Sequence, residues 1–162
     1  MIKPRVYVES SVVSHYYADD TPEKRDITRK LWEQLKRGEY EIVVSPVVYE
    51  EIEDCGTQEE IDALYDVLNM LEYTEVEETE KSLSLANEYL ETGVLPARAR
   101  ADCRHIAVAS ISDCKYILSW NMKHFVKRRT IEMVQEINGK LGVYQPNIQT
   151  PAIFIEGDDD NE

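Results

Sequence analysis

Two kinds of hydrophobic spacing alternate along the chain. Short runs of β-branched and aromatic residues predict strands at residues 5–8, 41–45, 73–76, 116–119 and 152–155. Between them, apolar residues three or four positions apart predict helices over residues 10–17, 22–37, 46–54, 57–72, 80–91, 98–112 and 128–138. Thr21-Pro22 and Ser45-Pro46, each a capping residue before a proline, mark two helix starts, and Ser10 or Ser11 caps the first short helix.

Strands that alternate with helices predict an α/β fold. Right-handed crossovers align successive strands in parallel, so we expect a three-layer α/β/α sandwich with a mostly parallel central sheet. The length of 162 residues, without an internal repeat or a linker, fits one domain over residues 1–155. Residues 156–162 hold five acids and no base, so we expect a disordered, solubilising tail, with a regulatory or partner-binding tail as the alternative.

Composition narrows the class of protein. No apolar run approaches the roughly 20 residues of a membrane helix, and the first residues lead into a strand rather than a signal peptide. We therefore expect a soluble, cytoplasmic protein with no membrane association. The three cysteines, Cys55, Cys103 and Cys114, show no CxxC spacing, which disfavours a disulfide framework or a zinc site and predicts buried free thiols.

Charge is unevenly distributed along the chain. The formal net charge is −14, yet residues 50–91 hold 15 acids and one base, whereas residues 98–129 hold eight bases and two acids. An acidic protein is a poor general binder of nucleic acid, but a basic segment within it can form a local patch that attracts phosphate. The alternative is that these charges form an ordinary solvated face.

Polar side chains occupy positions where predicted strands end. In parallel α/β sheets, ligands bind beyond the carboxyl ends of the strands, where loops converge. Glu9 follows the first strand, and Ser119 and Asn121 lie at the end of the strand at 116–119. These three side chains are therefore candidates for a site.

Two acids on helices are further candidates. Asp102 lies in the first turn of a helix whose remaining face is small or apolar, although the helix dipole alone also explains an acid there. Glu51 projects either toward the open edge of the sheet or into a solvated acidic face of its helix. Carboxylates that converge repel one another unless a hard cation neutralises them, and Mg²⁺ and Mn²⁺ take oxygen ligands and pair with phosphate substrates. Convergence predicts metal-assisted phosphodiester hydrolysis.

Three segments together resemble the PIN domain family, the metal-dependent ribonucleases that include VapC-type toxins. They are residues 6–13 (VYVESSVV), 44–52 (VSPVVYEEI) and 101–125, which begins ADCRHIAVA and ends LSWNMKHF. The resemblance implies that Glu9, Glu51 and Asp102 bind Mg²⁺ or Mn²⁺ and that Asn121 assists. Glu9 stands where the family usually has Asp, and Asn121 stands where it commonly has a fourth acid.

The resemblance also implies an activity and partners. It points to an endoribonuclease that leaves a 5′-phosphate, to the toxin role in a type II toxin–antitoxin module with a small antitoxin as partner, and to a homodimer. The side chains expected to contact RNA are Ser10, Arg98, Arg100, Arg104, Ser119, Lys123, Lys127, Arg128 and Arg129.

Alternatives stay open at three side chains and for the function as a whole. We expect His105 to be a packed histidine that bonds a backbone group rather than a general base. His124 either contacts RNA phosphate or caps its loop, and Trp120 either packs or stacks on a base. The altered acids also fit a PIN-like module that binds RNA or protein without cleaving it, and the same metal chemistry fits a structure-specific DNA nuclease.

Overall fold

The computed structural model describes residues 2–159, and within them five strands form one sheet in which every neighbouring pair is parallel. The strands lie in the order β3-β2-β1-β4-β5. Their bounds are β1 Arg5–Val8, β2 Glu41–Val44, β3 Tyr73–Glu75, β4 Tyr116–Leu118 and β5 Asn147–Gln149. The sheet is wholly rather than mostly parallel.

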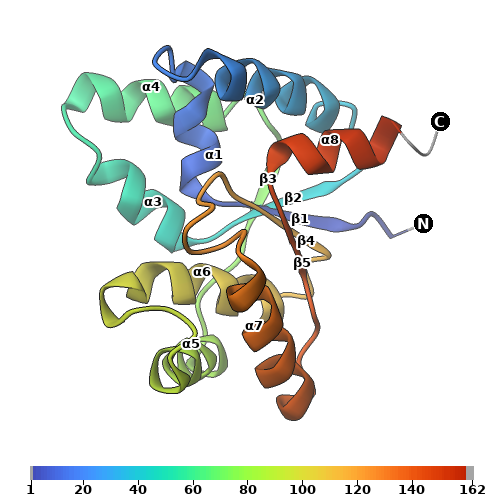
Figure 1. The fold of residues 1–162 in the computed structure, drawn as a ribbon. Helices are drawn as coiled ribbons and strands as arrows, with labels where there is room; N and C mark the ends of the chain where they lie inside the picture. The colour runs from blue at the N-terminus through green and yellow to red at the C-terminus, as the bar shows by residue number, and fades with distance from the viewer. Residues whose placement is uncertain (1, 160–162) are drawn as a thin grey trace.

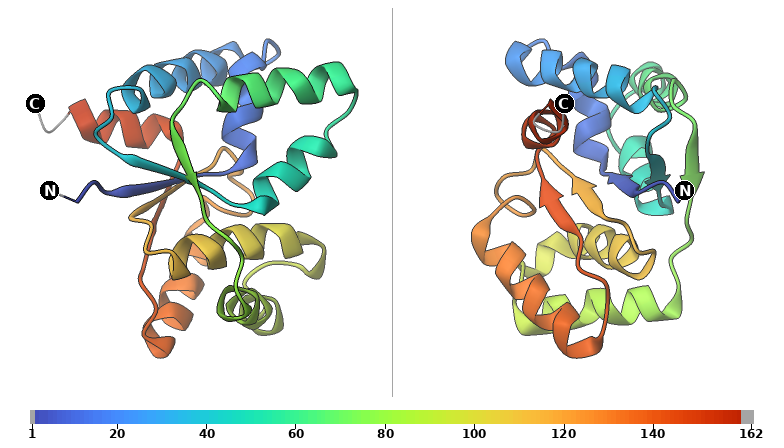
Figure 2. Two further views of the ribbon diagram at one scale, coloured as in Figure 1. Left: turned by 180° about the vertical axis from the view of Figure 1, so that it is seen from behind. Right: turned by 90° about the vertical axis from the view of Figure 1, so that its right-hand side faces the viewer.

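Helices cover both faces of the sheet (Figure 1). One layer holds α5 Glu80–Thr92, α6 Arg100–Ile111 and α7 Arg128–Leu141, with the 3-10 turn η2 Ala97–Ala99 before α6. The other holds α1 Ser10–Ser14, the 3-10 turn η1 His15–Tyr17, α2 Pro22–Leu35, α4 Gln58–Leu68 and α8 Pro151–Asp159. Helix α3 Pro46–Glu53 follows β2 and contacts α1, α4 and α6. Figure 2 shows the layers from two further sides, and the expected three-layer α/β/α sandwich is confirmed.

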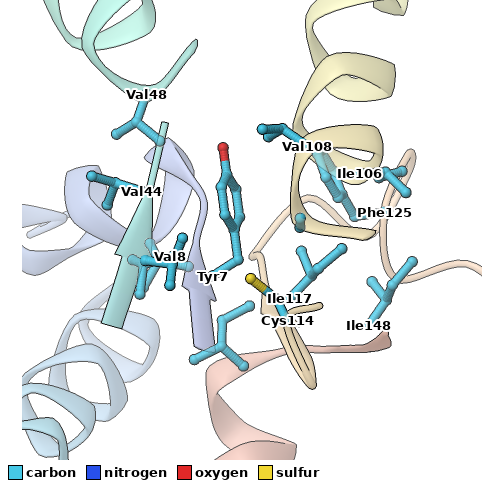
Figure 3. Close-up of a cluster of buried hydrophobic side chains, with 14 of the residues drawn as sticks. Tyr7, Val8, Val44, Val48, Ile106, Val108, Cys114, Ile117, Phe125 and Ile148 are labelled. Atoms are coloured by element: carbon cyan, nitrogen blue, oxygen red, sulfur yellow. The ribbon is translucent and has the colours of Figure 1, made fainter. Parts of the chain in front are cut away.

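The central strand β1 is buried on both faces. Val6, Tyr7 and Val8 are all 0% exposed. Because helices cover both sides, the strand is a continuous apolar run rather than an alternating one. In Figure 3, Tyr7 stands among the core side chains together with Ile117 of β4 and Ile106 of α6. Tyr7 therefore brings a hydroxyl group into an otherwise apolar interior.

Strand register brings the candidate side chains to one edge of the sheet. Val8 pairs with Leu118, so β1 and β4 end at the same level. The backbone N–H of Glu9 donates to the carbonyl of Leu118 at 3.2 Å. Glu9 and Ser119, 110 positions apart in the chain, are consequently neighbours.

The prediction of a C-terminal strand at residues 152–155 is wrong. These residues lie in α8, and the edge strand is β5, which ends just before Thr150. Thr150 caps the helix, because its hydroxyl oxygen accepts from the N–H of Ile153 at 3.3 Å, and Pro151 occupies the first helical position. Phe154 then packs its ring against Tyr40 and Tyr116. Thr150-Pro151 is the same signal that marks the helix starts at Pro22 and Pro46.

Several boundaries differ from expectation. The helix expected over residues 57–72 ends at Leu68, and the last expected helix runs on to Leu141. The first short helix is capped by Glu9 rather than by a serine. Helix α8 continues to Asp159, so the expected disordered tail begins inside a helix, whereas residues 160–162 lie outside the described part of the chain. In residues 2–159, no helix has both the length and the apolar character that crossing a membrane requires.

Candidate active site

The carboxylate of Glu9 is held by four hydrogen bonds. Its Oε1 accepts from Oγ of Ser10 at 2.8 Å and from the N–H of Ser11 at 3.0 Å, which makes Glu9 the cap of α1. Its Oε2 accepts from Oγ of Ser11 at 2.5 Å and from Oγ of Ser119 at 2.8 Å. The side chain is almost fully buried, and four donors to one carboxylate keep its orientation fixed.

Glu51 reaches the same point from α3. Its Oε1 accepts from Nε2 of His105 and lies 2.9 Å from Oγ of Ser10, whose single proton is shared between Glu9 and Glu51. The Ser10 hydroxyl therefore lies within hydrogen-bonding distance of both carboxylates, Glu9 and Glu51. Two acids separated by 42 positions are thus joined through one serine, and the side chain of Glu51 projects toward the site rather than into the acidic outer face of α3.

His105 supports Glu51 from inside the protein. The imidazole is completely buried; its Nδ1 lies 2.6 Å from the hydroxyl of Tyr7, and that hydroxyl lies 2.8 Å from Oγ of Ser45. Ser45 in turn caps α3 by accepting from the N–H of Val47. The expectation of a packed histidine is confirmed, but the ring bonds two side chains instead of a backbone group. The network ties β1, α3 and α6 together and leaves neither ring nitrogen without a partner.

Burial and hydrogen bonding move the pKa values of this network in consistent directions. Burial alone would raise the pKa of Glu51, but the hydrogen bond and the charge of His105 together with the hydrogen bond from Ser10 outweigh it, and the pKa is lowered overall. Burial alone would lower the pKa of His105, yet the hydrogen bond to Glu51 and the nearby charge of Glu9 raise it. Burial raises the pKa of the Tyr7 hydroxyl, which stays protonated. The pair therefore favours a carboxylate facing an imidazolium.

Asp102 approaches from the first turn of α6. Its Oδ2 lies 2.6 Å from Nδ1 of His124. Burial raises the pKa of Asp102, the negative charge of Glu9 adds to the shift, and the hydrogen bond from His124 only partly opposes it. The ionised form of Asp102 is thus destabilised, and a nearby cation would stabilise it.

Asn121 organises the loop that carries His124. Its Oδ1 accepts from the N–H groups of Lys123 at 3.2 Å and of His124 at 3.0 Å, and its own N–H donates to Oγ of Ser119 at 2.9 Å. The amide oxygen that we expected to assist a metal is therefore engaged in capping a turn. Phe125, completely buried, anchors the same loop.

The four predicted site residues meet in one hollow of about 320 Å³, which we call the acidic hollow. It is lined by Glu9, Ser10, Ser11, Ser14, Glu51, Ile52, Cys55, Leu64, Asp102 and Asn121. One possible ligand atom each from Glu9, Glu51 and His105 lie within 4.8 Å of one another, although His105 itself does not line the hollow. Asp102 lines the hollow but is not part of that tighter group.

The residues expected to contact RNA divide into different roles. Arg104 is held by two acids: its Nη1 lies 2.8 Å from Glu50 and its Nε 2.9 Å from Glu78. Ser119 is fully buried beneath Glu9. Arg104 thus belongs to an ion-pair cluster and Ser119 supports a carboxylate, while their expected contact with RNA stays a prediction.

The remaining cations are more open. Arg128 pairs with Glu132 along α7, and Arg129 donates to the backbone carbonyls of Gly93 and Val94. Arg98, Arg100, Lys123 and Lys127 are exposed, and in residues 2–159 no ion pair forms at these four. Trp120 is a packing residue, because only 7% of it is exposed and its Nε1 donates to Thr28.

Comparison with known proteins shows which solved structure has a similar fold. No protein-family model matches the chain, and no curated protein matches it. Among solved structures, the chain is similar to a chain of VapBC2 from Rickettsia felis, a complex bound to a DNA fragment from its promoter. The likeness covers 90% of this chain and 98% of that chain, with a TM-score of 0.56 and 14% sequence identity. The three-layer α/β/α arrangement is thus a PIN-like fold, and the likeness is one of fold alone.

Sequence reasoning missed part of the site. Tyr7 and Ser45 were assigned only to a strand and to a helix cap, and Cys55 was expected to be buried but is exposed at the acidic hollow. One signal was available: a tyrosine in a fully apolar strand and a histidine on a buried helix face both need hydrogen-bond partners. That they partner each other was not visible, because 98 positions separate them.

Proposed function

We propose that the protein is a Mg²⁺- or Mn²⁺-dependent endoribonuclease whose metal ligands are Glu9, Glu51 and Asp102. The observation that carries the proposal is the convergence of these three carboxylates, from three distant segments, on the acidic hollow. The donor set suits such a cation, because carboxylate oxygens are the ligands that Mg²⁺ and Mn²⁺ prefer. The pKa of Asp102 is raised, first by burial and also by the charge of Glu9, so a nearby cation would stabilise its ionised form.

Each residue has a definite task in this proposal. Ser10 lies between the carboxylates of Glu9 and Glu51 and hydrogen-bonds with them, and His105 fixes the orientation of Glu51. When bound, the divalent cation supplies activated water and stabilises charge that develops on the phosphate. Arg98, Arg100, Lys123 and Lys127 attract the RNA backbone toward a site that is itself negative.

The same proposal extends to partners. We infer a toxin of a type II toxin–antitoxin module, with a small antitoxin protein and a homodimeric assembly, because the structurally similar chain belongs to a VapBC2 complex. Co-expression with the genes that flank this one, followed by affinity purification and light scattering, tests both points. A chain that is monomeric and purifies without a small partner would contradict them.

Cleavage assays test the enzymatic proposal directly. Labelled single-stranded RNAs, hairpins and tRNA are incubated with the protein in Mn²⁺, in Mg²⁺ or in EDTA. We expect metal-dependent cleavage that leaves 5′-phosphates and is lost in Glu51→Gln and in Asp102→Asn. Glu53→Gln is the matched control, because Glu53 is an exposed acid on the same helix as Glu51 and does not line the acidic hollow. Cleavage that persists in Asp102→Asn would refute the ligand assignment.

A second function has its own supporting observation. Both oxygens of Glu9 already accept two hydrogen bonds each, and Oδ1 of Asn121 accepts two more, so these groups are satisfied without a cation. This favours a PIN-like module that binds RNA or protein without cleaving it. Binding that is equal in EDTA and in Mn²⁺, together with no cleavage of any RNA, would select this second function.

A further inference from the structure

Strand β3 forms one edge of the sheet, and its outer side is open. It pairs only with β2, and in Figure 2 (right) the green strand lies at the margin of the molecule with no helix beyond it. The N–H of Val76 donates to the carbonyl of Val44 at 2.9 Å, so the backbone groups of Val76 and, two positions earlier, Thr74 face β2. Those of Tyr73 and Glu75 face outward, and within residues 2–159 no hydrogen bond engages them. The edge therefore offers two donors and two acceptors to another extended chain.

Three partly buried tyrosines, which we call the tyrosine cluster, lie beside this edge. They are Tyr49 of α3, Tyr65 of α4 and Tyr73 of β3 itself. The ring centroids of Tyr49 and Tyr65 are 6.0 Å apart, and the Tyr65 hydroxyl donates to Oε1 of Glu53 at 2.9 Å. Burial, followed by the interaction with Tyr73, raises the pKa of Tyr49, so the third ring belongs to the same group. Aromatic faces bordered by a carboxylate suit a Lys or Arg side chain.

The surroundings of β3 are acidic. No Lys or Arg occurs between Arg37 and Lys81, and Glu72, Glu75 and Glu77 in and around the strand are exposed. In the described part of the chain, no ion pair engages these three acids. Like charges placed opposite each other destabilise a strand pair, so this edge disfavours a second copy of itself and is complementary to a basic segment.

The charge changes along the strand and sets where a basic side chain fits. At the start of β3, a hollow of about 620 Å³ is lined by Lys3 and Lys36 as well as by Glu72, so acids are offset by cations there. Glu75 lies at the other end of β3 and does not line that hollow. Because side chains two positions apart share one face of a strand, Glu75 projects to the same face as Tyr73. A cation on this face meets both the carboxylate and the tyrosine cluster.

We propose that β3 pairs with an extended, basic segment of a partner protein, whose backbone bonds Tyr73 and Glu75 and whose Lys or Arg side chain lies over the tyrosine cluster. In this mode of recognition, backbone hydrogen bonds supply affinity and alternate side chains supply specificity. Neither the tyrosine cluster nor Glu75 lines the acidic hollow, so the interaction does not depend on the proposed nuclease function.

Synthetic peptides test the proposal on the full chain. The probe is Lys-Val-Arg-Val-Lys-Val-Arg-Val-Lys, which places its cations on one face when extended. One control has Pro at every Val, which keeps the charge but removes the N–H donors, and a second has Glu at every Lys and Arg. Fluorescence anisotropy of labelled peptides should show the probe binding about tenfold more tightly than the proline peptide, and no binding of the acidic one.

Variants at Glu75 separate the backbone from the charge. The N–H of Glu75 points away from β2, so Glu75→Pro removes only an outward donor, which an edge strand tolerates. Glu75→Ala removes the same charge and keeps that N–H. We expect Glu75→Ala to weaken probe binding about threefold and Glu75→Pro about tenfold more. Glu91→Ala, at an exposed acid in the last turn of α5, is the matched control and should bind like wild type.

Tyr65→Leu keeps an apolar side chain and removes one aromatic face, so probe binding should weaken about threefold. Equal binding of the probe and the proline peptide would overturn the proposal, and this comparison does not depend on the folding of any variant. Equal weakening by Glu75→Ala and Glu91→Ala would overturn it too, because only general charge attraction acts equally at both sites. A dimer, seen by sedimentation, that the probe dissociates would also overturn it and assign the edge to a second copy of the chain.

Discussion

Nε2 of His105 donates a hydrogen bond to Oε1 of Glu51, although the two residues are 54 positions apart and the imidazole is completely buried. The contact holds a carboxylate of the acidic hollow against the interior of the fold. Because removal of one member of a buried charged pair leaves the other uncompensated, the pair is a sensitive point for both stability and pH dependence.

His105→Gln is expected to lower the free energy of unfolding by about 3 kcal/mol, with a pH dependence that follows from the pKa shifts. The pKa of His105 is raised, so its contribution is complete below the ordinary value of 6.5 and is lost as pH rises through the folded value. The pKa of Glu51 is lowered, so its contribution is complete above 4.5 and is lost as pH falls through the folded value. Urea denaturation of wild type and variant should differ most between these two values; a difference that is constant across pH would contradict the pair.

Ser119→Ala removes one of four donors from buried Glu9. We expect a loss of about 2 kcal/mol in the free energy of unfolding, because the carboxylate cannot reach water instead. Ser14→Ala serves as the control: Ser14 also lines the acidic hollow, but its hydroxyl donates to the backbone carbonyl of Ser11 and not to Glu9. Equal melting temperatures for the two variants would show that Glu9 does not depend on Ser119.

Asp102→Asn is expected to stabilise the metal-free protein. The pKa of Asp102 is raised, first by burial, so ionisation costs stability once pH exceeds the ordinary value of 3.8, and the full cost is present above the folded value. At neutral pH the amide should raise the free energy of unfolding by about 1 kcal/mol, or Tm by about 3 °C, in EDTA.

Added metal should make the wild type more stable than Asp102→Asn, the reverse of their order in EDTA. Mn²⁺ should raise Tm of the wild type and leave Asp102→Asn nearly unchanged, because only the former binds the cation tightly. Asp113→Asn, at an exposed acid just after α6, should behave as wild type in both conditions. A wild-type Tm that does not respond to Mn²⁺ or Mg²⁺ would argue for the non-catalytic module.

Arg104→Gln should destabilise the fold by about 1 kcal/mol and leave RNA affinity unchanged, because its guanidinium is already committed to Glu50 and Glu78. Lys123→Gln should leave the stability unchanged and weaken RNA binding, since Lys123 is exposed beside Arg98 and Lys127. Filter binding of a single-stranded RNA and thermal melts of both variants make the comparison. A loss of RNA affinity in Arg104→Gln would restore the role that its sequence position suggested.

The three thiols should differ sharply in reactivity. Burial raises the pKa of both Cys103 and Cys114 to about 12, so neither supplies a thiolate at neutral pH. Cys55 is exposed and lines the acidic hollow. Titration with Ellman's reagent should therefore modify one thiol per native chain and all three in guanidinium. Modification of Cys55→Ser at the wild-type rate would contradict this assignment.

The sequence by itself determined the layers of the fold and the positions of the site acids on its strands and helices. Apolar spacing is a local property, and it indicated β1, β2, β4 and most helices because each must bury one side or both. Polar residues that directly follow such strands, Glu9 and Ser119 among them, could be placed at one sheet edge from topology alone. Even the mistaken strand at 152–155 carried its correct signal in Thr150-Pro151.

Only the tertiary structure decided what each polar side chain does. The partners of Tyr7, His105 and Glu51 come from segments separated by 38 to 98 positions, and packing rather than spacing selects them. The same packing commits Arg104 to two acids while it leaves Lys127 open beside the N-terminus of α7. A hydrogen bond requires two groups within about 3 Å, and that condition is met in the folded chain, not in the order of its residues.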